Sequence, residues 1–409
     1  MHSQDRPSVV FAVNGLAGGG AERVVVTLAN HCNEPELETV LVVGDDSGPY
    51  RSEIKPHVRV IVHDLSLTVT NTLAFARTMR ARFRGHGVRA VVSHLDQMNR
   101  MMMRARMLRA FDAPVIVVEQ CDVRHAFSNR GHGRLEGLIF RKEIPWLYRA
   151  AHAVVGVSQG VTESIVGHLR LPKSHVHTIY NPVDLDVVKA AAKLRPADSF
   201  SERFDALPKP VFLAVGRLVP QKAFHNLIAA FQRLPAERRG SLVILGEGEL
   251  DRELRSLAER LGVGDQVHLP GFVRNPWWYM ARCDQFVLSS AFEGFGLVIV
   301  EALAAGALVV STDCPSGPSE IVTDRENGRL VPVDDVERLA QAMADTLSLS
   351  SDEAMLQRAR GLASIERFRP GAILSEYLGL SLVNGQTREL GARRSSERLP
   401  DDAARRGGA

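Results

Sequence analysis

The 409-residue sequence has few cysteines, almost no net charge and no hydrophobic run long enough to cross a membrane. Its four cysteines, Cys32, Cys121, Cys283 and Cys314, are far apart and match no metal-site or redox-motif spacing. We therefore expect free thiols in a reducing cytoplasm. A net charge of +3 gives no reason to expect a nucleic-acid partner.

The sequence also lacks the features of a secreted or membrane-spanning chain. Residues 1–15 have no signal-peptide layout, because a strand pattern begins almost at once. One apolar stretch, GLVIVEALAAGALVV, is too short for a bilayer span and contains Glu301. We expect a cytoplasmic protein that can work at the inner face of the cell membrane.

What the sequence has is enough material for two domains. It is 45% hydrophobic and 24% charged, as in ordinary globular proteins of this size. Short apolar strands alternate with amphipathic helices in both halves, which predicts doubly wound α/β domains. A turn-rich segment without strands separates the halves, and the last residues are polar enough to predict a disordered tail. The predicted segments are a first domain at 1–184, a linker at 185–208, a second domain at 209–366 and a tail at 383–409.

Two glutamates mark the stretch that says most about function. Glu293 and Glu301 enclose a glycine-rich turn and an apolar run, between a predicted strand (FVLSS) and the next one (ALVVS). In parallel sheets, ligands bind at the carboxyl ends of strands and against helix N-termini, so both carboxylates can face one crevice. There they would accept hydrogen bonds from the paired hydroxyls of a sugar or ribose. The alternative is an exposed Glu301, but its neighbours are apolar and an unpaired buried charge is costly.

This stretch resembles a known family signature. EGFGLVIVE, two glutamates with seven residues between them, resembles the signature of the retaining nucleotide-sugar glycosyltransferases of family 4. GGAERVV and GRLVPQKAF resemble two further loops of that family, and STDCPSGPSEI resembles the subset that builds bacterial surface polysaccharides. The resemblance covers about residues 8–380. It implies the GT-B fold, in which two Rossmann-like doubly wound domains face each other across a cleft and a last helix, here 367–382, crosses back to the first domain.

The resemblance also implies a reaction. A hexosyl unit would pass from a nucleotide diphosphate sugar to a saccharide or a polyprenyl-diphosphate-linked acceptor, with retention of configuration. UDP is the expected nucleotide and GDP the alternative. No metal and no cofactor are expected, so fixed cations must neutralise the diphosphate that leaves.

Roles follow residue by residue from this resemblance. Glu293 would bind donor-sugar hydroxyls, Glu301 the ribose, and Arg217 with Lys222 the diphosphate. Ala223 stands where the family usually has glycine. The donor and nucleotide site would further include Gly246, Val273, Arg274, Gly294, Phe295, Gly296 and Leu297, and the loop near the phosphates or acceptor would include Gly18, Gly19 and Gly20.

The acceptor side is less well defined. Many relatives have a histidine after the fifth strand, where this chain reads VVEQCDVRH. Either Gln120 supplies a neutral hydrogen bond there, or His125 reaches in, or the alignment is shifted. His94 also ends a strand toward the cleft, although a lone histidine at a strand end is usually structural.

Two other patterns have competing interpretations. The segment between Arg77 and Arg109 holds nine arginines, one acid and many methionines. It is either a solvated helix face over a methionine-rich core, or a patch for anionic lipid head groups or a lipid-diphosphate acceptor. Asp184-Leu185-Asp186 has the spacing of a metal-binding pair, but it follows the first domain directly, so we expect a hinge there and no metal site.

Two other classes of protein remain as alternatives. A sugar-nucleotide epimerase of the same architecture would need acid and base groups and lacks the glutamate pair in this spacing. A non-catalytic GT-B scaffold is disfavoured by the intact Arg217, Lys222, Glu293 and Glu301.

Overall fold

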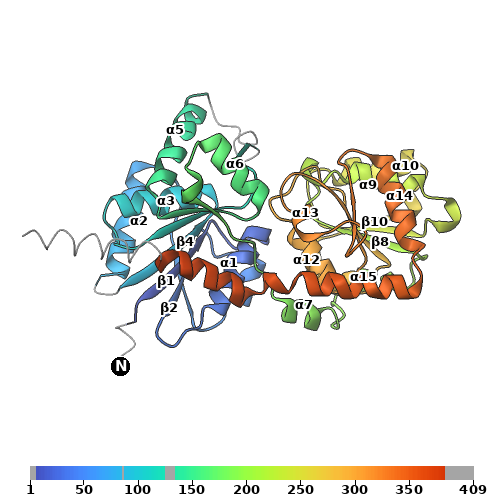
Figure 1. The fold of residues 1–409 in the computed structure, drawn as a ribbon, viewed down its shortest axis with the longest axis horizontal. Helices are drawn as coiled ribbons and strands as arrows, with labels where there is room; N and C mark the ends of the chain where they lie inside the picture. The colour runs from blue at the N-terminus through green and yellow to red at the C-terminus, as the bar shows by residue number, and fades with distance from the viewer. Residues whose placement is uncertain (1–5, 85–86, 125–133, 383–409) are drawn as a thin grey trace, which may run out of the picture.

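The computed structural model describes residues 6–84, 87–124 and 134–382, and these form two domains that lie side by side (Figure 1). Along each domain, short strands alternate with helices. Both sheets are parallel throughout their paired strands. This arrangement confirms the predicted fold class of two Rossmann-like domains.

The first domain is organised around strands that are buried on both faces. β1 (Ser8–Val13) and β5 (Val115–Glu119) are buried along their whole length, so helices must cover both sides of the sheet. Within the described residues the sheet has seven strands in the order β3-β2-β1-β4-β5-β6-β7. The other strands are β2 (Glu38–Val43), β3 (Val58–Val62), β4 (Val88–His94), β6 (Ala153–Gly156) and β7 (Val176–Thr178). The covering helices are α1 (Gly20–His31), α2 (Val69–Arg82), α3 (Asp96–Met107), α5 (Arg134–Ala150) and α6 (Gln159–Leu169).

The second domain repeats the same plan with six strands among the described residues, in the order β10-β9-β8-β11-β12-β13. The strands are β8 (Val211–Val215), β9 (Ser241–Leu245), β10 (Val267–Gly271), β11 (Gln285–Leu288), β12 (Val309–Thr312) and β13 (Arg329–Val331). The helices are α9 (Phe224–Arg233), α10 (Asp251–Arg260), α11 (Pro276–Met280), α12 (Leu297–Ala304), α13 (Pro318–Ile321), α14 (Val336–Leu347) and α15 (Ser351–Ser364).

Side-chain caps fix several helix starts. Thr68 accepts a hydrogen bond from the amide of Asn71 at the start of α2, and Ser158 accepts one from Val161 at the start of α6. Ser350 and Glu353 form a full capping box at the start of α15. Such caps satisfy amides that have no acceptor inside the helix, and each contributes about 1 kcal/mol.

The linker between the domains is more ordered than the sequence predicts. It contains two short helices, α7 (Leu185–Ala191) and α8 (Ser199–Phe204), which the side chains of Asp184 and Asp198 cap. Asn275 donates to two carbonyls of the linker at 2.8 Å. The linker therefore packs as part of the second domain.

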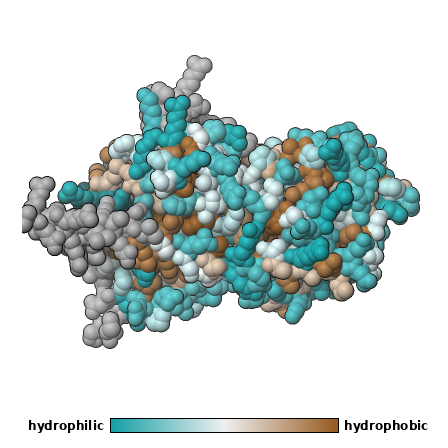
Figure 2. Space-filling view, in the orientation of Figure 1, coloured by the Kyte–Doolittle hydropathy of each residue, from teal (hydrophilic) through white to brown (hydrophobic). Residues whose placement is uncertain are grey.

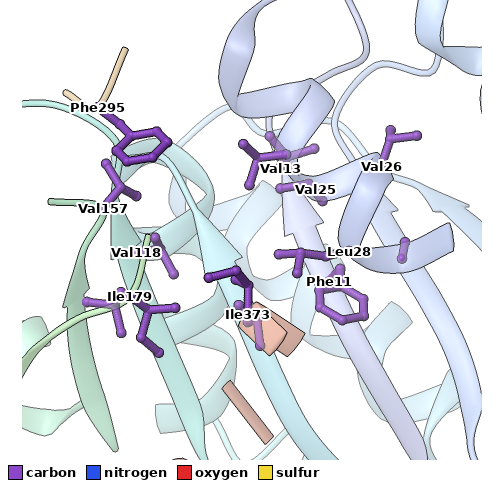
Figure 3. Close-up of a cluster of buried hydrophobic side chains, with 14 of the residues drawn as sticks. Phe11, Val13, Val25, Val26, Leu28, Val118, Val157, Ile179, Phe295 and Ile373 are labelled. Atoms are coloured by element: carbon purple, nitrogen blue, oxygen red, sulfur yellow. The ribbon is translucent and has the colours of Figure 1, made fainter. Parts of the chain in front are cut away.

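The chain returns to the first domain after α15. Helix 370–382 lies against the first sheet (Figure 1). Its anchors Ile373 and Tyr377 are fully buried, and Figure 3 shows Ile373 among side chains of the first domain. Burying one such side chain contributes about 1.5–3 kcal/mol, so this helix ties the two ends of the fold together.

An aromatic cluster joins the domains beside the two chain crossings. The Phe295 ring of the second domain lies 5.7 Å from Tyr180 and 5.1 Å from Phe368, centre to centre. Figure 3 shows Phe295 next to Val157 of the first domain. The loop before α12 is therefore inserted into the first domain, which fixes how the cleft is aligned.

The arginine-rich and methionine-rich segment is largely internal. Met101, Met102 and Met103 of α3 are fully buried, so the interpretation of this face as a methionine-rich core is correct. Arg104 pairs with Glu143 of α5 at 2.6 Å, and Arg106 donates to two carbonyl oxygens. These two arginines hold helices together, which favours the structural interpretation for this part of the segment, and contact of the segment with lipid stays a prediction.

Most of the visible surface is polar, with apolar areas on both domains (Figure 2). None of the helices in the described part of the chain combines the length and apolar character that a bilayer span needs.

Candidate active site

A close ion pair stands at the centre of the cleft side of the second domain. Lys222 ends the short helix η3 (Pro220–Lys222) after β8, and Glu293 follows the neighbouring strand β11. Lys222 Nζ lies 2.6 Å from Glu293 Oε1, and Ser290 Oγ donates to the same oxygen at 2.6 Å. No hydrogen bond to Glu293 Oε2 is found among the described residues. This second oxygen is therefore available to a ligand hydroxyl.

Arg217 is a second cation in the same loop. It is exposed, and the described residues offer it no hydrogen bond or ion pair. Its charge acts on Glu22 of the first domain. Burial raises the pKa of Glu22, and the positive charge of Arg217 partly offsets this rise. A guanidinium with unused donors beside a lysine suits phosphate oxygens.

The backbone of this loop keeps a glycine-like shape although the residue is alanine. Ala223 has φ +45° and ψ +40°, which is the left-handed region. That conformation costs an alanine about 1 kcal/mol relative to a right-handed one. Ala223 thus adopts the conformation that glycine favours, and it carries strain.

Glu301 lies in a cavity between the domains. It is 7% exposed, so it is not a surface helix residue. The cavity measures about 350 Å³ and is lined by residues of both domains and of the crossing, including Arg23, Trp277, Leu297 and Arg274. Burial raises the pKa of Glu301, and Arg23 and the Trp277 N–H partly offset this. A carboxylate in such a place is a strong acceptor for hydroxyl groups once it is ionised.

Two glycines let the chain turn sharply between the glutamates. A Cβ on Gly294 would lie 1.9 Å from the carbonyl oxygen of Gln120 in the first domain, so only glycine fits this approach. Gly296 has φ +94° and caps α12, a conformation that favours glycine. The first amides of α12, from Leu297 onward, have no acceptor inside the helix and can bind a ligand oxygen. The Phe295 side chain is packed in the aromatic cluster, so only its backbone can take part.

The glycine loop of the first domain faces this site. Gly18 accepts a hydrogen bond from the Tyr50 hydroxyl at 3.1 Å, and Gly19 caps α1. A Cβ on Gly20 would lie 3.2 Å from Leu297 Cδ1 of the second domain. The loop therefore meets the start of α12 directly across the cleft.

Gln120 is held by a network of the first domain. Its Nε2 lies 2.9 Å from His94 Nδ1 and 3.1 Å from Asn181 Oδ1, and Asn181 donates back to its Oε1 at 2.9 Å. His94 is fully buried, and burial lowers its pKa to about 3. Since an amide nitrogen can only donate, the neutral His94 accepts at Nδ1. His94 therefore positions Gln120, and its buried ring does not reach an acceptor substrate. His125 lies outside the described residues.

Of the remaining predicted nucleotide contacts, one presents a side chain to the cavity and two could contribute only backbone atoms. Arg274 is exposed and lines the cavity, as a nucleotide contact should. Gly246 donates its amide to Gly271 at 2.9 Å, and Val273 is buried, so both shape the strand ends and only their backbones could meet a base.

The aspartates of the Asp184-Leu185-Asp186 segment serve the crossing. Asp184 caps α7 and lies 3.1 Å from His31 Nε2, and Asp186 pairs with Arg369 at 3.0 Å. Across residues 6–84, 87–124 and 134–382, no group of three or more His, Cys, Asp or Glu side chains could hold a metal ion.

Sequence reasoning missed several residues that the fold brings to the cleft. Arg23 and Trp277 meet across it, and Asn181 holds Gln120. Glu320 accepts hydrogen bonds from the amides of Gln159 and Gly160 at the start of α6. Only Arg23 had a local signal, because it directly follows the glycine loop.

Two doubly wound domains with a cationic loop and two glutamates at their cleft define a class of protein, the GT-B glycosyltransferases. Comparisons with known proteins agree with this class. The family model described as "Glycosyltransferase Family 4" matches residues 18–187, and "Glycosyl transferases group 1" matches residues 198–361.

One relative extends over most of the chain, and another over less than half of it. An N-acetylgalactosaminyltransferase of Campylobacter jejuni, named for a diphospho-undecaprenol-linked acceptor, is 30% identical over 82% of this chain and 88% of its own. The lipopolysaccharide core biosynthesis glycosyltransferase LpsE of Rhizobium meliloti is 37% identical over 42% of this chain and 49% of its own. The protein belongs to the family 4 glycosyltransferases.

Solved structures support the fold. Anabaena Alr3699/HepE in complex with UDP superposes with a TM-score of 0.73 at 18% identity, covering 95% of this chain and all of the other. Sucrose-phosphate synthase of Thermosynechococcus elongatus superposes with a TM-score of 0.72 at 19% identity, with the same coverage.

Proposed function

We propose that this protein is a retaining hexosyltransferase that uses a nucleotide diphosphate sugar, UDP-linked by preference. The observation that carries the proposal is the Lys222–Glu293 pair at 2.6 Å with the free Arg217 in the same loop. The pair combines a cation for the diphosphate with an acceptor for sugar hydroxyls. Glu301 then supplies a ribose site in the adjoining cavity.

The reaction proceeds by front-face displacement. The bond between the anomeric carbon and the diphosphate oxygen breaks, and the acceptor oxygen bonds to that carbon from the same face. The proton of the acceptor hydroxyl passes to the departing phosphate oxygen. The transition state resembles an oxocarbenium ion, and Arg217, Lys222 and the first amides of α12 stabilise the negative charge that develops on the diphosphate.

Within a retaining course, the state of Glu293 favours front-face displacement over a covalent intermediate. Its carboxylate is bonded to Lys222 and Ser290, which lowers its strength as a nucleophile. The protein carries out this chemistry without a metal ion, because the two cations take the place of one. The matched relatives whose names include lipid-linked or lipopolysaccharide products suggest the acceptor, a saccharide or lipid-linked saccharide of the cell surface.

A transfer assay tests the proposal. Purified protein is mixed with UDP-hexoses and, in parallel, with GDP-mannose, with and without polyprenyl-diphosphate-linked saccharides. If the protein is a retaining transferase, nucleotide diphosphate should be released only when the acceptor is present. The anomeric carbon should have the same configuration in the product as in the donor. An epimerised donor without nucleotide release would instead show an epimerase, and no turnover with any donor would favour a scaffold.

We further propose that the first domain meets an anionic membrane through α2. Val69 is 77% exposed and Leu73 40%, and Arg77 is exposed one turn further along the same face. An exposed apolar and basic helix face suits an interface with anionic lipid. Such a placement would bring the cleft to an acceptor that is held in the membrane.

Liposome flotation tests this contact. Val69→Ser with Leu73→Ser should reduce flotation with anionic vesicles, and Arg77→Gln should reduce it further. The control Arg233→Gln removes an exposed arginine of the second domain. Flotation that is absent in the wild type, or equal in all variants, would refute the contact without affecting the proposed chemistry.

A further inference from the structure

An arginine of the first domain lies on an aromatic ring of the second at the cavity that contains Glu301. The Arg23 guanidinium carbon is 4.5 Å from the centre of the Tyr50 ring and 5.0 Å from that of Trp277. Arg23 also donates from Nε to the Tyr50 hydroxyl at 3.2 Å. Tyr50 therefore holds the Arg23 guanidinium in place, and from there the guanidinium reaches across the cleft to the Trp277 ring.

Arg23 has few other ties that would explain this placement. Its remaining hydrogen bond is to Glu53 at 3.3 Å, and the Glu53 side chain is 44% exposed. A surface pair of this kind contributes little. The contact across the cleft to Trp277 and the nearby charge of Glu301 are the other interactions of the Arg23 guanidinium.

Trp277 carries a buried donor beside the Glu301 carboxylate. Its side chain is 7% exposed and lines the cavity, and its indole Nε1 makes no hydrogen bond of ordinary geometry among the described residues. The N–H is nevertheless close enough to Glu301 to lower the pKa of that carboxyl, so the carboxylate is the acceptor it faces. Buried N–H groups are nearly always well paired, because leaving one poorly paired is costly. A ligand group that enters between the two could accept from the N–H and donate to the carboxylate.

The chemistry of that group can be read from its two neighbours. A hydroxyl can donate to the Glu301 carboxylate and accept from the Trp277 N–H at the same time. A ribose offers two such hydroxyls side by side. A phosphate could accept from the indole N–H but would be repelled by the carboxylate.

We propose that Arg23 and Trp277 form a clamp across the cleft over the nucleoside of the donor. Trp277 shares the ribose with Glu301, and Arg23 holds the first domain against the Trp277 ring as a positioning residue. This inference rests on the proposed function, because it assumes that Glu301 binds ribose. Because Arg23 belongs to the first domain and Trp277 to the second, nucleotide binding at this clamp depends on the position of the two domains.

Tryptophan fluorescence and calorimetry test the clamp with UDP as the probe. The chain has three tryptophans, and Trp146, on α5, is 56% exposed and is not among the residues that line the cavity. UDP should change the fluorescence of the wild type and of Trp146→Phe but not of Trp277→Phe. Trp277→Phe keeps a ring and loses the N–H, so UDP affinity should fall about 3- to 10-fold, the effect of one hydrogen bond.

A double-mutant cycle tests whether the two residues act together. Arg23→Gln and Trp277→Leu should each weaken UDP binding, and the double variant should lose less than the product of the two separate losses. Arg51→Gln is the matched control, because Arg51 lies next to Tyr50 and pairs with Asp46 at 3.3 Å, away from the residues that line the cavity. Inorganic pyrophosphate should bind Trp277→Phe as it binds the wild type, since the clamp acts on the nucleoside.

The outcomes separate this inference from the function on which it rests. If the wild type binds neither UDP nor GDP, the proposed function fails and the clamp with it. If the wild type binds UDP but the clamp variants bind it equally well, or their losses multiply independently, the clamp alone is overturned. Thermal unfolding of each variant shows whether a loss reflects the site or a less stable fold, and Arg23→Lys should recover part of the affinity only if the charge over Trp277 matters.

Discussion

Glu301 is a buried carboxylate, and its surroundings favour the protonated, neutral form. Burial raises its pKa, and the cations and donors of the cleft only partly offset that effect. Ribose hydroxyls need the ionised form as acceptor. Binding of nucleotide should therefore depend on pH in a range where an ordinary glutamate is already fully ionised.

The variant Glu301→Gln tests this at the scale of one residue. Between pH 7.5 and 5, UDP affinity of the wild type should fall about 3- to 10-fold more than that of Glu301→Gln, because protonation removes a charged acceptor. The raised pKa of Glu301 sets the sign, since acidification neutralises it first. Calorimetry at each pH gives both affinities, and their ratio cancels the titration of UDP itself. Parallel pH profiles would contradict the role of Glu301.

Single residues could be predicted where their spacing alone carried the signal. Glu293 and Glu301 stand out by their separation, and Lys222 by its loop. Arg23 and Trp277 could not be found this way, because their partnership depends on how two domains dock. The sequence left a cleft contact and a structural role open for His94 and favoured the structural role, which agrees with the packing of helix 370–382 against it through Tyr377.

At the scale of elements, an ion pair ties α1 to the domain crossing. His31 Nε2 lies 3.1 Å from Asp184 Oδ2, and Asp184 also caps α7. The hydrogen bond to Asp184 raises the pKa of His31, and the same bond lowers the pKa of Asp184. The pair therefore joins the end of α1 to the start of the linker while His31 is charged.

The contribution of the His31–Asp184 pair to the free energy of unfolding should vary with pH. A raised histidine pKa stabilises the fold fully below the unfolded value of about 6.5, and the effect is lost as pH rises through the folded pKa. His31→Gln should thus cost about 1 kcal/mol at pH 5.5 and much less at pH 9. Thermal unfolding at both pH values measures this. His168→Gln is the control, because His168 bonds a backbone carbonyl, Ser164 O, at 3.1 Å. An equal cost of His31→Gln at both pH values would show that the pair adds no charge-dependent stability.

Elements with strong apolar patterns could be predicted, and elements fixed by local caps could not. The strands around β1 and β11 are short apolar runs that read directly from the sequence. The linker helices depend on Asp184 and Asp198 as caps inside a turn-rich segment, and their apolar faces are too short to give a pattern. The arginines of α3 appeared basic and exposed because their partner Glu143 is distant in the sequence.

For the whole molecule, the decisive feature is how closely the domains approach. The Gly294 backbone abuts the carbonyl of Gln120, and Glu320 caps α6 from the opposite domain. The alternation in each half predicted two doubly wound domains, and the family resemblance implied that they face each other. The sequence could not give their alignment, because that alignment rests on side chains from both halves.

Gly294→Ala should force the domains apart. Its Cβ would lie 1.9 Å from Gln120 O, so the cleft must open or the loop must shift. Misplacing catalytic groups by about 1 Å can cost about 100-fold in rate, so kcat should fall by roughly that factor while each domain stays folded. Steady-state kinetics with small-angle scattering checks this. Gly167→Ala is the control, since nothing lies within 4 Å of its Cβ position. Unchanged rate and shape in Gly294→Ala would mean that the close approach is not needed for catalysis.

The most direct test of the account is a calorimetric titration of the wild type, Lys222→Ala and Glu301→Ala with UDP and GDP. We expect the wild type to bind one nucleotide tightly and each variant to bind it at least about tenfold more weakly. Lys222→Ala removes a cation that faces the diphosphate, and Glu301→Ala removes an acceptor for the ribose hydroxyls. Binding of neither nucleotide by the wild type, or binding that neither substitution weakens, would contradict a donor site at this cleft.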